Sequence, residues 1–281
     1  MNGEVTEYRQ FNSSYIENKM TTKYIGKKVV YYDEIDSTNI AAKQLGKQPG
    51  NHGVLVLARQ QHAGRGRLGR IWSSPKGTGV WMTLVLQPGI RPEHASMLTL
   101  VAALAVNQGI RKVTGLESFI KWPNDIVVNG KKVCGILTEM NTAGGKLECV
   151  VIGMGINTNQ ESFSDDLKIS ATSLRLESRS EIDKTELIVY IMEYFEHYFE
   201  RFEKTESLKE LIKEYNEVLI NRNRQVKILG ADTDYIGLAL GINETGALLV
   251  QTEEIIQGVS TATVKAVMSG EVSVRGVYGY V

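Results

Sequence analysis

Residues 119–140 read Phe119-Ile-Lys-Trp-Pro-Asn-Asp-Ile-Val-Val-Asn-Gly-Lys-Lys-Val-Cys-Gly-Ile-Leu-Thr-Glu-Met140, two β-prone runs joined by Asn129-Gly130. Asn-Gly between such runs is the strongest short-range signal for a β-hairpin. A second turn at Ala143-Gly144-Gly145 leads into an apolar run over 147–157. Together these runs predict an antiparallel meander, which with the flanking helices indicates an α+β fold rather than a doubly wound one.

Hydrophobic periodicity places further strands and helices around this meander. The strands are expected at 28–33, 54–59 and 79–86, and the helices at 36–45 and 93–113. The second of these helices is apolar nearly all round and should be buried. Two later helices have capping-box starts, Asp183 with Glu186 and Ser207 with Glu210.

The chain divides into three expected parts. Residues 1–27 are polar and lack periodicity, which predicts a poorly ordered or peripheral arm. Residues 28–222 should form a domain with a mixed, largely antiparallel sheet flanked by helices, in which the polar segment 158–182 is expected to be a lid or disordered. Residues 223–281 alternate short strands with turns, which predicts a small SH3-like β-barrel.

Composition limits the classes of function. Thirty-two basic residues balance thirty-two acidic ones in 281, so no overall field attracts the chain to nucleic acid or to a membrane. The longest apolar stretch, 95–106, is too short to cross a bilayer, and the first ten residues lack a signal region. Cys134 and Cys149 lie in separate apolar runs, which favours core thiols over a disulfide. We therefore expect a cytoplasmic protein in which any anion site is local.

The segment Gly64-Arg-Gly-Arg-Leu-Gly-Arg-Ile-Trp72 alternates glycines with arginines between two predicted strands. Three guanidinium groups cost too much to bury unpaired, so they must face solvent or an anion. Glycine allows backbone N–H groups to approach a ligand closely. A flexible basic surface loop is the alternative, but strands hold this segment at both ends, which favours a site for phosphate or carboxylate.

Two further places combine rigid backbone with polar groups. Pro123 presents Asn124 and Asp125 at a strand end, unless the pair only closes an Asx turn. Lys132 is expected on the same side of its strand as Cys134. If that side is buried, Lys132 needs an anionic partner; if it is not, Lys132 is an ordinary lysine at a strand edge.

Glycines and a helix start mark two more candidate positions. Gly153 and Gly155 interrupt an apolar strand that Asn157 ends, and glycine inside a strand usually marks a bulge or the close approach of a ligand or another backbone. Residues 36–39, Asp-Ser-Thr-Asn, open a helix, where Ser37 could be a simple N-cap or part of a polar clamp. The scattered histidines have no zinc-ligand spacing, and the sequence has neither a Ser-His-Asp order nor a P-loop.

This combination resembles the biotin–protein ligases, also called biotin–[acetyl-CoA-carboxylase] ligases. Gln61–Trp72 resembles the biotin and adenylate loop of the family, and four further motifs follow in the family's order: Lys121–Asp125, Lys132–Gly135, Gly153–Asn157 and Gly270–Arg275. The resemblance implies that ATP activates biotin to biotinyl-5′-AMP, and that a lysine of a carrier domain then takes the biotinyl group. ATP and Mg²⁺ would be co-substrate and ion, biotin the substrate, with no permanently bound cofactor.

The resemblance also implies roles for single residues. Arg65, Arg67 and Lys132 would offset the repulsion between carboxylate and triphosphate, and Asp125 would help to deprotonate the acceptor lysine. The biotin pocket would contain Ser37, Thr38, Asn39, Gln61, Gly64, Arg65, Lys132, Gly135 and Gly153. The nucleotide would contact Arg67, Arg70, Trp72, Asn124, Gly155, Asn157, Glu271 and Arg275, with Asn124 near Mg²⁺ through the phosphates. Glu271 and Arg275 resemble a pair that helps to bind ATP or the carrier protein, and the 158–172 segment resembles the loop that orders over adenine.

Two other functions stay open at this point. A lipoate or octanoate ligase has a related catalytic domain, although the glycine–arginine loop and the Lys-Trp-Pro-Asn motif favour biotin. A non-enzymatic nucleic-acid-binding module is the second, and the neutral net charge argues against it. Since about 27 residues precede the first predicted strand, we expect a ligase without the repressor activity of some members. The expected partner is a biotin carboxyl carrier domain of acetyl-CoA carboxylase or a related carboxylase, and paired edge strands could give a homodimer.

Overall fold

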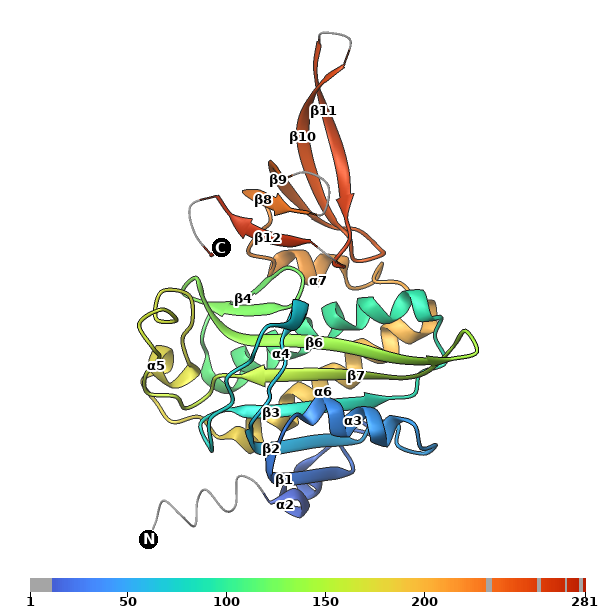
Figure 1. Cartoon of the computed structure of the whole chain (residues 1–281), viewed down its shortest axis with the longest axis vertical. Helices are drawn as coiled ribbons and strands as arrows, with labels where there is room; N and C mark the ends of the chain where they lie inside the picture. Colours follow the sequence, from blue (N-terminus) through green and yellow to red (C-terminus); the bar gives the residue numbers. More distant parts are fainter. Residues whose placement is uncertain (1–11, 231–233, 257–258, 271, 278–279) are drawn as a thin grey trace.

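The computed structural model describes residues 12–230, 234–256, 259–270, 272–277 and 280–281, so the predicted site residue Glu271 lies outside the described residues. Figure 1 shows a larger sheet with helices and a smaller sheet beyond it. The helices are α2 (Ser13–Lys19), α3 (Thr38–Gly46), α4 (Leu98–Thr114), α5 (Leu174–Ser178), α6 (Lys184–Thr205) and α7 (Ile212–Glu217), with short helical turns η1 (Arg67–Gly69) and η2 (Pro92–Met97). The strands are β1 (Val29–Ile35), β2 (Leu55–Gln61), β3 (Val80–Leu86), β4 (Ser118–Lys121), β5 (Asp125–Val128), β6 (Lys131–Ala143), β7 (Lys146–Ile156), β8 (Arg224–Leu229), β9 (Tyr235–Ile242), β10 (Leu248–Ile256), β11 (Val259–Val267) and β12 (Ser273–Gly276).

The larger sheet is the predicted mixed, largely antiparallel one. Its seven strands lie in the order β1-β2-β3-β7-β6-β5-β4, and only β1 and β2 are parallel neighbours. Asn129 and Gly130, at φ 49° and 74°, form the predicted turn between β5 and β6. The run 119–128 is not one strand, because the turn at 122–124 divides it into β4 and β5, which pair with each other.

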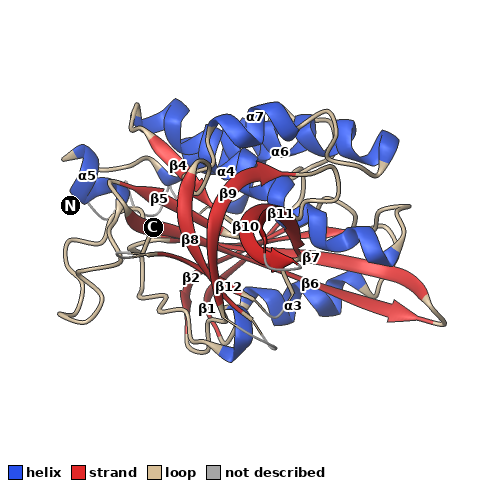
Figure 2. Cartoon of the chain, turned by 90° about the horizontal axis from the view of Figure 1, so that it is seen from above, coloured by secondary structure: helices blue, strands red, loops and turns tan. Residues whose placement is uncertain are grey.

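Helices cover this sheet unequally on its two faces (Figure 2). The long helices α4 and α6 pack together on one face and bury the main core there, with the predicted apolar stripe of α6 facing inward through residues such as Phe195 and Phe199. On the other face α3 packs over β2, β3 and β7 around a small cluster of Ala42, Val54, Val56, Val85 and Val151. Beyond α3 the second face carries the cavity described below.

The two predicted capping boxes have different outcomes. Asp183 is the N-cap of α6, and its carboxylate accepts the backbone N–H groups of Thr185 and Glu186. The prediction at Ser207 is wrong, because α7 begins only at Ile212 and its N-cap, Leu211, provides no side-chain hydrogen bond. The backbone N–H of Leu208 instead donates to the carbonyl of Glu244 in the small domain, which holds residues 207–211 outside a helix.

The described part of the N-terminal arm belongs to the core rather than to the periphery. Ile16 on α2 and Ile25 are fully buried. Glu196 on α6 accepts the backbone N–H groups of Lys23, Tyr24 and Ile25 at 2.8–3.0 Å. The arm was expected outside the fold because its sequence shows no period, and this contact depends on a carboxylate far away in the chain. Residues 1–11 lie outside the described residues.

The C-terminal strands form one antiparallel sheet in the order β11-β10-β9-β8-β12, as expected for the small β domain. Trp122, almost fully buried, joins the two domains by donating its indole N–H to the carbonyl of Gly246 at 3.0 Å. In the part of the chain that the structure describes, we find no helix with the length and apolarity needed to span a bilayer.

Candidate active site

A cavity of about 940 Å³ opens on the same face of the large sheet as α3, over the part of that face that α3 does not cover. Strands β6 and β7 form its floor. Its walls come from the N-terminus of α3, from residues 64–72 (the flap), from segment 160–171, and from residues 272–275 and 280 of the small domain. A volume of this size accommodates a sizeable organic ligand.

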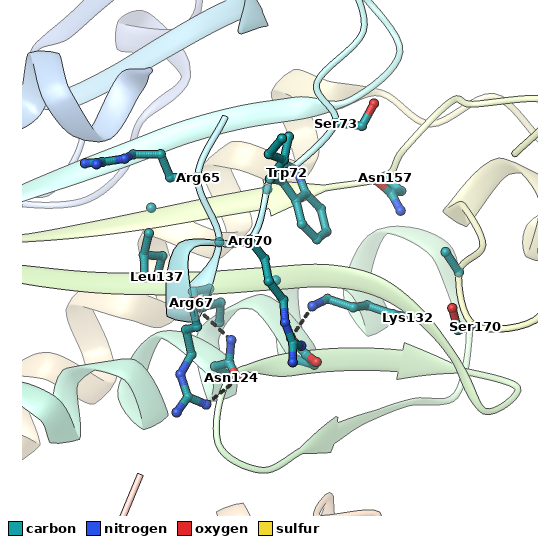
Figure 3. A pocket seen from close by; sticks show the side chains of 18 of the residues that line it. Arg65, Arg67, Arg70, Trp72, Ser73, Asn124, Lys132, Leu137, Asn157 and Ser170 are labelled. Carbon is teal, nitrogen blue, oxygen red and sulfur yellow. Dashed lines mark hydrogen bonds and ion pairs between the residues drawn. The ribbon is translucent and has the colours of Figure 1, made fainter. Parts of the chain in front are cut away.

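The flap is a closed hairpin rather than an irregular loop. The N–H of Trp72 donates to the carbonyl of Gly64 at 2.9 Å, and the N–H of Gly66 donates to that of Arg70 at 2.7 Å. At the tip, Leu68 and Gly69 have φ angles of 55° and 72°, the left-handed region that glycine adopts freely. Figure 3 shows the side chain of Arg65 pointing away from those of Arg67 and Arg70, which extend to the same side of this hairpin.

Glycines lower the cavity floor. A Cβ atom on Gly153 would lie 2.1 Å from Asn39 Oδ1, and one on Gly155 would lie 2.4 Å from Trp72 Nε1. A Cβ atom on Gly135 would lie 3.0 Å from the Trp72 ring and 3.1 Å from the Lys132 side chain. The predicted close approach is therefore present, and the groups that use it are side chains rather than another backbone.

Lys132 faces the cavity, but not by the predicted alternation. Val127 pairs with Lys132 while Ile126 pairs with Cys134, so the intervening residue is a β-bulge in β6. Since a one-residue shift reverses the side of the sheet that a side chain occupies, Lys132 lies opposite Cys134, which is fully buried in the main core. The expected anionic partner exists: Lys132 Nζ lies 2.6 Å from Asp125 Oδ1. Its ammonium also lies 5.1 Å from the centre of the Trp72 ring.

Two cavity residues escaped the sequence analysis as site candidates. Lys121 begins the Lys-Trp-Pro-Asn-Asp motif and has no predicted role of its own; it is 6% exposed, and burial lowers its pKa to about 8. Tyr280 contacts both Lys121 and Asp125, and no sequence pattern marks it because its partners lie some 155 residues away. The sequence signal for Lys121 was available, since it begins the Lys-Trp-Pro-Asn-Asp run.

Arg67 ties the flap to both domains. Its Nη1 donates to Asn124 Oδ1 at 3.1 Å, and its Nη2 donates to the carbonyls of Ser269 and Gly270. Burial lowers the pKa of Arg67. Arg65 points elsewhere, with Nη1 3.9 Å from Glu139 Oε1, and its side chain is half exposed. The two arginines therefore occupy different ends of the cavity.

A polar network closes the end of the cavity next to α3. Ser37 occupies the N-cap position but makes no capping hydrogen bond, so its hydroxyl is not committed to the helix. The backbone N–H and the hydroxyl of Thr38 both donate to Gln61 Oε1, at 2.9 and 3.0 Å. Thr83, on β3, donates to Asn39 Oδ1 at 2.7 Å. These groups give this end of the cavity fixed donors and acceptors.

The segment after β7 is held in place at both of its ends. Asn157 Nδ2 donates to the carbonyl of Thr172 at 3.1 Å, and Gln160 Nε2 donates to Asn157 Oδ1 at 3.1 Å. The backbone of Lys132 pairs with the far end of the segment, accepting from Thr172 and donating to Ser170. Residues 158–173 therefore form a wall with fixed ends, and α5 lies within the stretch predicted to be a loop.

Charge and unpaired polar atoms show what the cavity can bind. The described residues of its lining include six basic side chains, Arg65, Arg67, Arg70, Lys121, Lys132 and Arg275, and one carboxylate, that of Asp125. Trp72 Nε1, Asp125 Oδ1 and Gln160 Oε1 are buried in this lining without a hydrogen-bond partner. Lys132 contacts Asp125 Oδ1 as an ion pair outside hydrogen-bond geometry. The excess of basic side chains favours an anionic ligand. Since buried polar atoms are normally satisfied, the unpaired donor and the two unpaired acceptors indicate that this ligand also carries hydrogen-bonding groups.

The protein residues alone offer little to a metal ion. Among the described residues, no three His, Cys, Asp or Glu side chains gather as a metal site. Asn124 Oδ1 already accepts from Arg67, and its Nδ2 donates to the carbonyl of Ile136 at 3.0 Å. Mg²⁺ prefers phosphate and carboxylate oxygens, so an ion in this cavity would be held mainly by the phosphates of a nucleotide.

The structure brings nearly all of the predicted site residues into one lining. Gly64 is the exception, because it lies at the base of the flap, where a Cβ would be 2.3 Å from the carbonyl oxygen of Trp72. Glu271 lies outside the described residues. The roles assigned to the others remain predictions, since proximity does not show what each residue binds.

Comparison with known proteins agrees with this geometry. Residues 31–157 match the biotin/lipoate A/B protein ligase family, and residues 223–275 match the biotin protein ligase C-terminal domain. The bifunctional ligase/repressor BirA of Bacillus subtilis strain 168 is 39% identical over 260 residues, covering 91% of this chain and 79% of that protein. The biotin–[acetyl-CoA-carboxylase] ligase of Paracoccus denitrificans is 45% identical over 125 residues, covering 43% of this chain and 51% of that protein.

A solved structure supports the same assignment. The biotin protein ligase from Aquifex aeolicus in complex with biotin and ATP superposes with a TM-score of 0.74 at 27% identity, covering 89% of this chain and 99% of that one. Both family regions therefore match in sequence, and the whole architecture matches in space. The chain belongs to the biotin protein ligases.

Proposed function

We propose that this enzyme joins biotin to ATP, giving biotinyl-5′-AMP, and transfers the biotinyl group to a lysine of a biotin carboxyl carrier domain. In the first step a biotin carboxylate oxygen attacks the α-phosphorus of ATP, the bond between that phosphorus and the bridging oxygen breaks, and pyrophosphate leaves with the electron pair. In the second step the lysine nitrogen attacks the biotinyl carbonyl carbon and AMP leaves.

The first step requires an anion to approach a polyanion. Fixed cations lower this barrier by offsetting the repulsion and the charge that develops at phosphorus. Lys132 is suited to the reacting centre, because its ammonium lies on the glycine floor between the two ends of the cavity. We assign the α3 end, with Ser37, Thr38 and Asn39, to biotin.

The opposite end is assigned to ATP. Arg67, Arg70 and Arg275 line it, and Trp72 lies over the floor where it can cover the adenylate. Mg²⁺ enters with the phosphates of ATP, and Asn124 contacts it only through them. In the second step Asp125 Oδ1, buried and without a hydrogen-bond donor, accepts a proton from the lysine nitrogen.

One observation carries the proposal: among the described residues, six cations and a single carboxylate surround a cavity in a chain whose net charge is zero. Biotin-dependent exchange of pyrophosphate into ATP tests it. We expect Lys132→Ala to lower this exchange at least a hundredfold, whereas Lys131→Ala, its neighbour outside the cavity lining, should leave it within twofold. Equal exchange by the Lys132 variant and wild type would remove Lys132 from the reaction.

The carrier and the acyl donor are tested together. With labelled biotin, ATP and a carrier domain of acetyl-CoA carboxylase, we expect label on the carrier. Transfer from lipoate or octanoate but not from biotin would assign the enzyme to the related ligases instead. The match of residues 223–275 to the biotin protein ligase C-terminal domain supports biotin.

Three narrower expectations remain predictions. The Bacillus subtilis relative is named a ligase/repressor, whereas we predict no repression here; binding to a specific DNA operator at physiological salt would contradict this. Pairing of the edge strand β1 with that of a second copy would give a homodimer, which sedimentation equilibrium would detect; the other edge strand, β4, already bonds to residues 218–220 through Ile120. A reducing, cytoplasmic location agrees with two cysteines that are both buried and unpaired.

A further inference from the structure

Tyr280 brings the end of the described chain into the cavity. Its hydroxyl donates to Asp125 Oδ2 at 2.5 Å, and its ring lies under the ammonium of Lys121, 4.1 Å from the ring centre. Both partners are nearly buried. A side chain of the small domain thus contacts the carboxylate assigned to the second step, although its residue lies beyond the last strand, β12.

The residue that follows Tyr280, Val281, packs near two glycines, Gly276 and Gly130. Val281 lies against Gly276, where a Cβ atom would be 2.2 Å from its carbonyl oxygen. The side chain of Val281 also approaches the β5–β6 turn, 3.5 Å from the Cβ position of Gly130. The residue after Tyr280 is therefore packed between β12 and the turn that precedes Lys132, and any side chain at Gly276 would displace it.

The contact makes the two oxygens of Asp125 different. Burial raises the pKa of Tyr280 far above its usual value, so the hydroxyl keeps its proton and acts as a donor. Oδ2 is thereby occupied. Oδ1 faces the ammonium of Lys132 at 2.6 Å and has no hydrogen-bond donor of its own. Oδ1 is therefore the oxygen better placed to accept a hydrogen bond from a group that enters the cavity.

We propose that Tyr280 is a positioning residue for biotinyl transfer: its hydroxyl fixes Asp125 so that Oδ1, beside Lys132, meets the nitrogen of the acceptor lysine. The proposal rests on the role given to Asp125 in the proposed function. Without the hydroxyl, the carboxylate can rotate and turn Oδ1 away. Tyr280 touches neither biotin nor the acceptor lysine in this scheme, and acts through Asp125 alone.

Single-turnover transfer tests the proposal. Preformed biotinyl-5′-AMP is bound to the full-length enzyme, and a carrier domain that the wild type labels is added at increasing concentration. We expect Tyr280→Phe, which keeps the ring beneath Lys121, to lower the maximal rate constant of transfer about tenfold, as for loss of a hydrogen bond to a charged group. The carrier concentration that gives half of that rate should not change. Pyrophosphate exchange, which does not involve the acceptor lysine, should fall by a smaller factor than transfer.

Two further variants separate positioning from a structural role. Tyr235→Phe is the matched control, since Tyr235 is also in the small domain and lies under a lysine, Lys265, but outside the cavity lining. It should transfer at the wild-type rate. In an Asp125→Asn background, Tyr280→Phe should change transfer by less than twofold, because a residue that acts through Asp125 has nothing left to position.

Each other result overturns the inference in a recognisable way. Wild-type transfer by Tyr280→Phe, or an equal loss in the Asp125→Asn background, would show that the hydroxyl does not act through Asp125. Loss only with Tyr280→Leu would assign the effect to the ring and Lys121. Unchanged transfer by Asp125→Asn would overturn both this inference and the role of Asp125. Absence of biotin transfer by the wild type would instead contradict the proposed function itself.

Discussion

Replacing Gly153 with alanine should lower stability through a single clash. The added Cβ would lie 2.1 Å from Asn39 Oδ1, far inside contact distance. Gly153 cannot move away, because β7 is a central strand. Within it, Gly153 pairs with Thr83 on β3 and with Leu137 on β6. Asn39 is the side chain that must rotate, although it is 5% exposed and hydrogen-bonded on both sides.

The expected magnitude follows from the bonds that Asn39 makes. Rotation breaks the bond from Thr83 to Asn39 Oδ1 and the bond from Asn39 Nδ2 to Glu139, at 2.7 and 2.9 Å. Each is worth about 1 kcal/mol, and a buried polar atom left unpaired adds about 1 kcal/mol more. Alanine recovers about 0.5–1 kcal/mol over glycine in a strand. The free energy of unfolding should fall by about 2 kcal/mol, with a Tm roughly 5 °C lower.

Calorimetry and denaturant unfolding of a small set of variants test this reasoning. Gly89→Ala is the matched control: no atom lies within 4 Å of its Cβ position and its φ is not positive, so we expect no change. In an Asn39→Ala background, Gly153→Ala should cost nothing, because the clashing amide is gone. A loss of about 2 kcal/mol in that background as well would refute the explanation. Biotin titrations should show about tenfold weaker binding for Gly153→Ala, since Asn39 lies at the proposed biotin end.

Other predictions concern the helices and a buried lysine. Asp183→Ala should lower the free energy of unfolding by about 1 kcal/mol because the carboxylate caps α6, whereas Ser207→Ala should lower it less, because Ser207 does not cap α7 and its hydroxyl makes only exposed hydrogen bonds, with the N–H of Lys209 and the carbonyl of Glu244; urea unfolding compares them. Glu196→Gln should cost about 2 kcal/mol by weakening the acceptor of three backbone N–H groups, and wild-type stability would contradict that. Between pH about 8 and 10.5 only the unfolded state keeps the Lys121 proton, so stability should rise with pH by up to about 3 kcal/mol in that window, and Lys121→Met should remove the rise.

Local signals predicted the parts of the fold that local interactions determine. Asn129-Gly130 gave its hairpin because those two residues accept positive φ wherever they occur. Asp183 gave its cap because the N–H groups it binds are two and three residues away. The glycines at 153 and 155 indicated a close approach correctly, since removal of a side chain from a strand is visible in the sequence itself. Residues of this kind need no knowledge of distant partners.

The remaining features depend on contacts between distant segments. Leu208 is drawn to the carbonyl of Glu244 across the domain boundary, so a good capping pattern at Ser207 forms no helix. Residues 12–27 enter the core only because Glu196 provides acceptors for their backbone. Tyr280 reaches Asp125 through packing that no spacing or composition describes. The sequence could therefore identify the motifs that line the cavity, but not Tyr280, which contacts Lys121 and Asp125 there.

The β-bulge beside Lys132 has a consequence for how insertions and deletions act on this family. Removing one residue there restores a regular ladder and turns the lysine toward α4 and α6, whereas adding or removing two residues keeps it in the cavity. A homologue that lacks the bulge residue, Val133, would thus keep the lysine in its sequence and yet lose it from the cavity. Odd-length gaps between the Asn-Gly turn and Gly135 should accordingly mark relatives in which this lysine no longer faces the cavity.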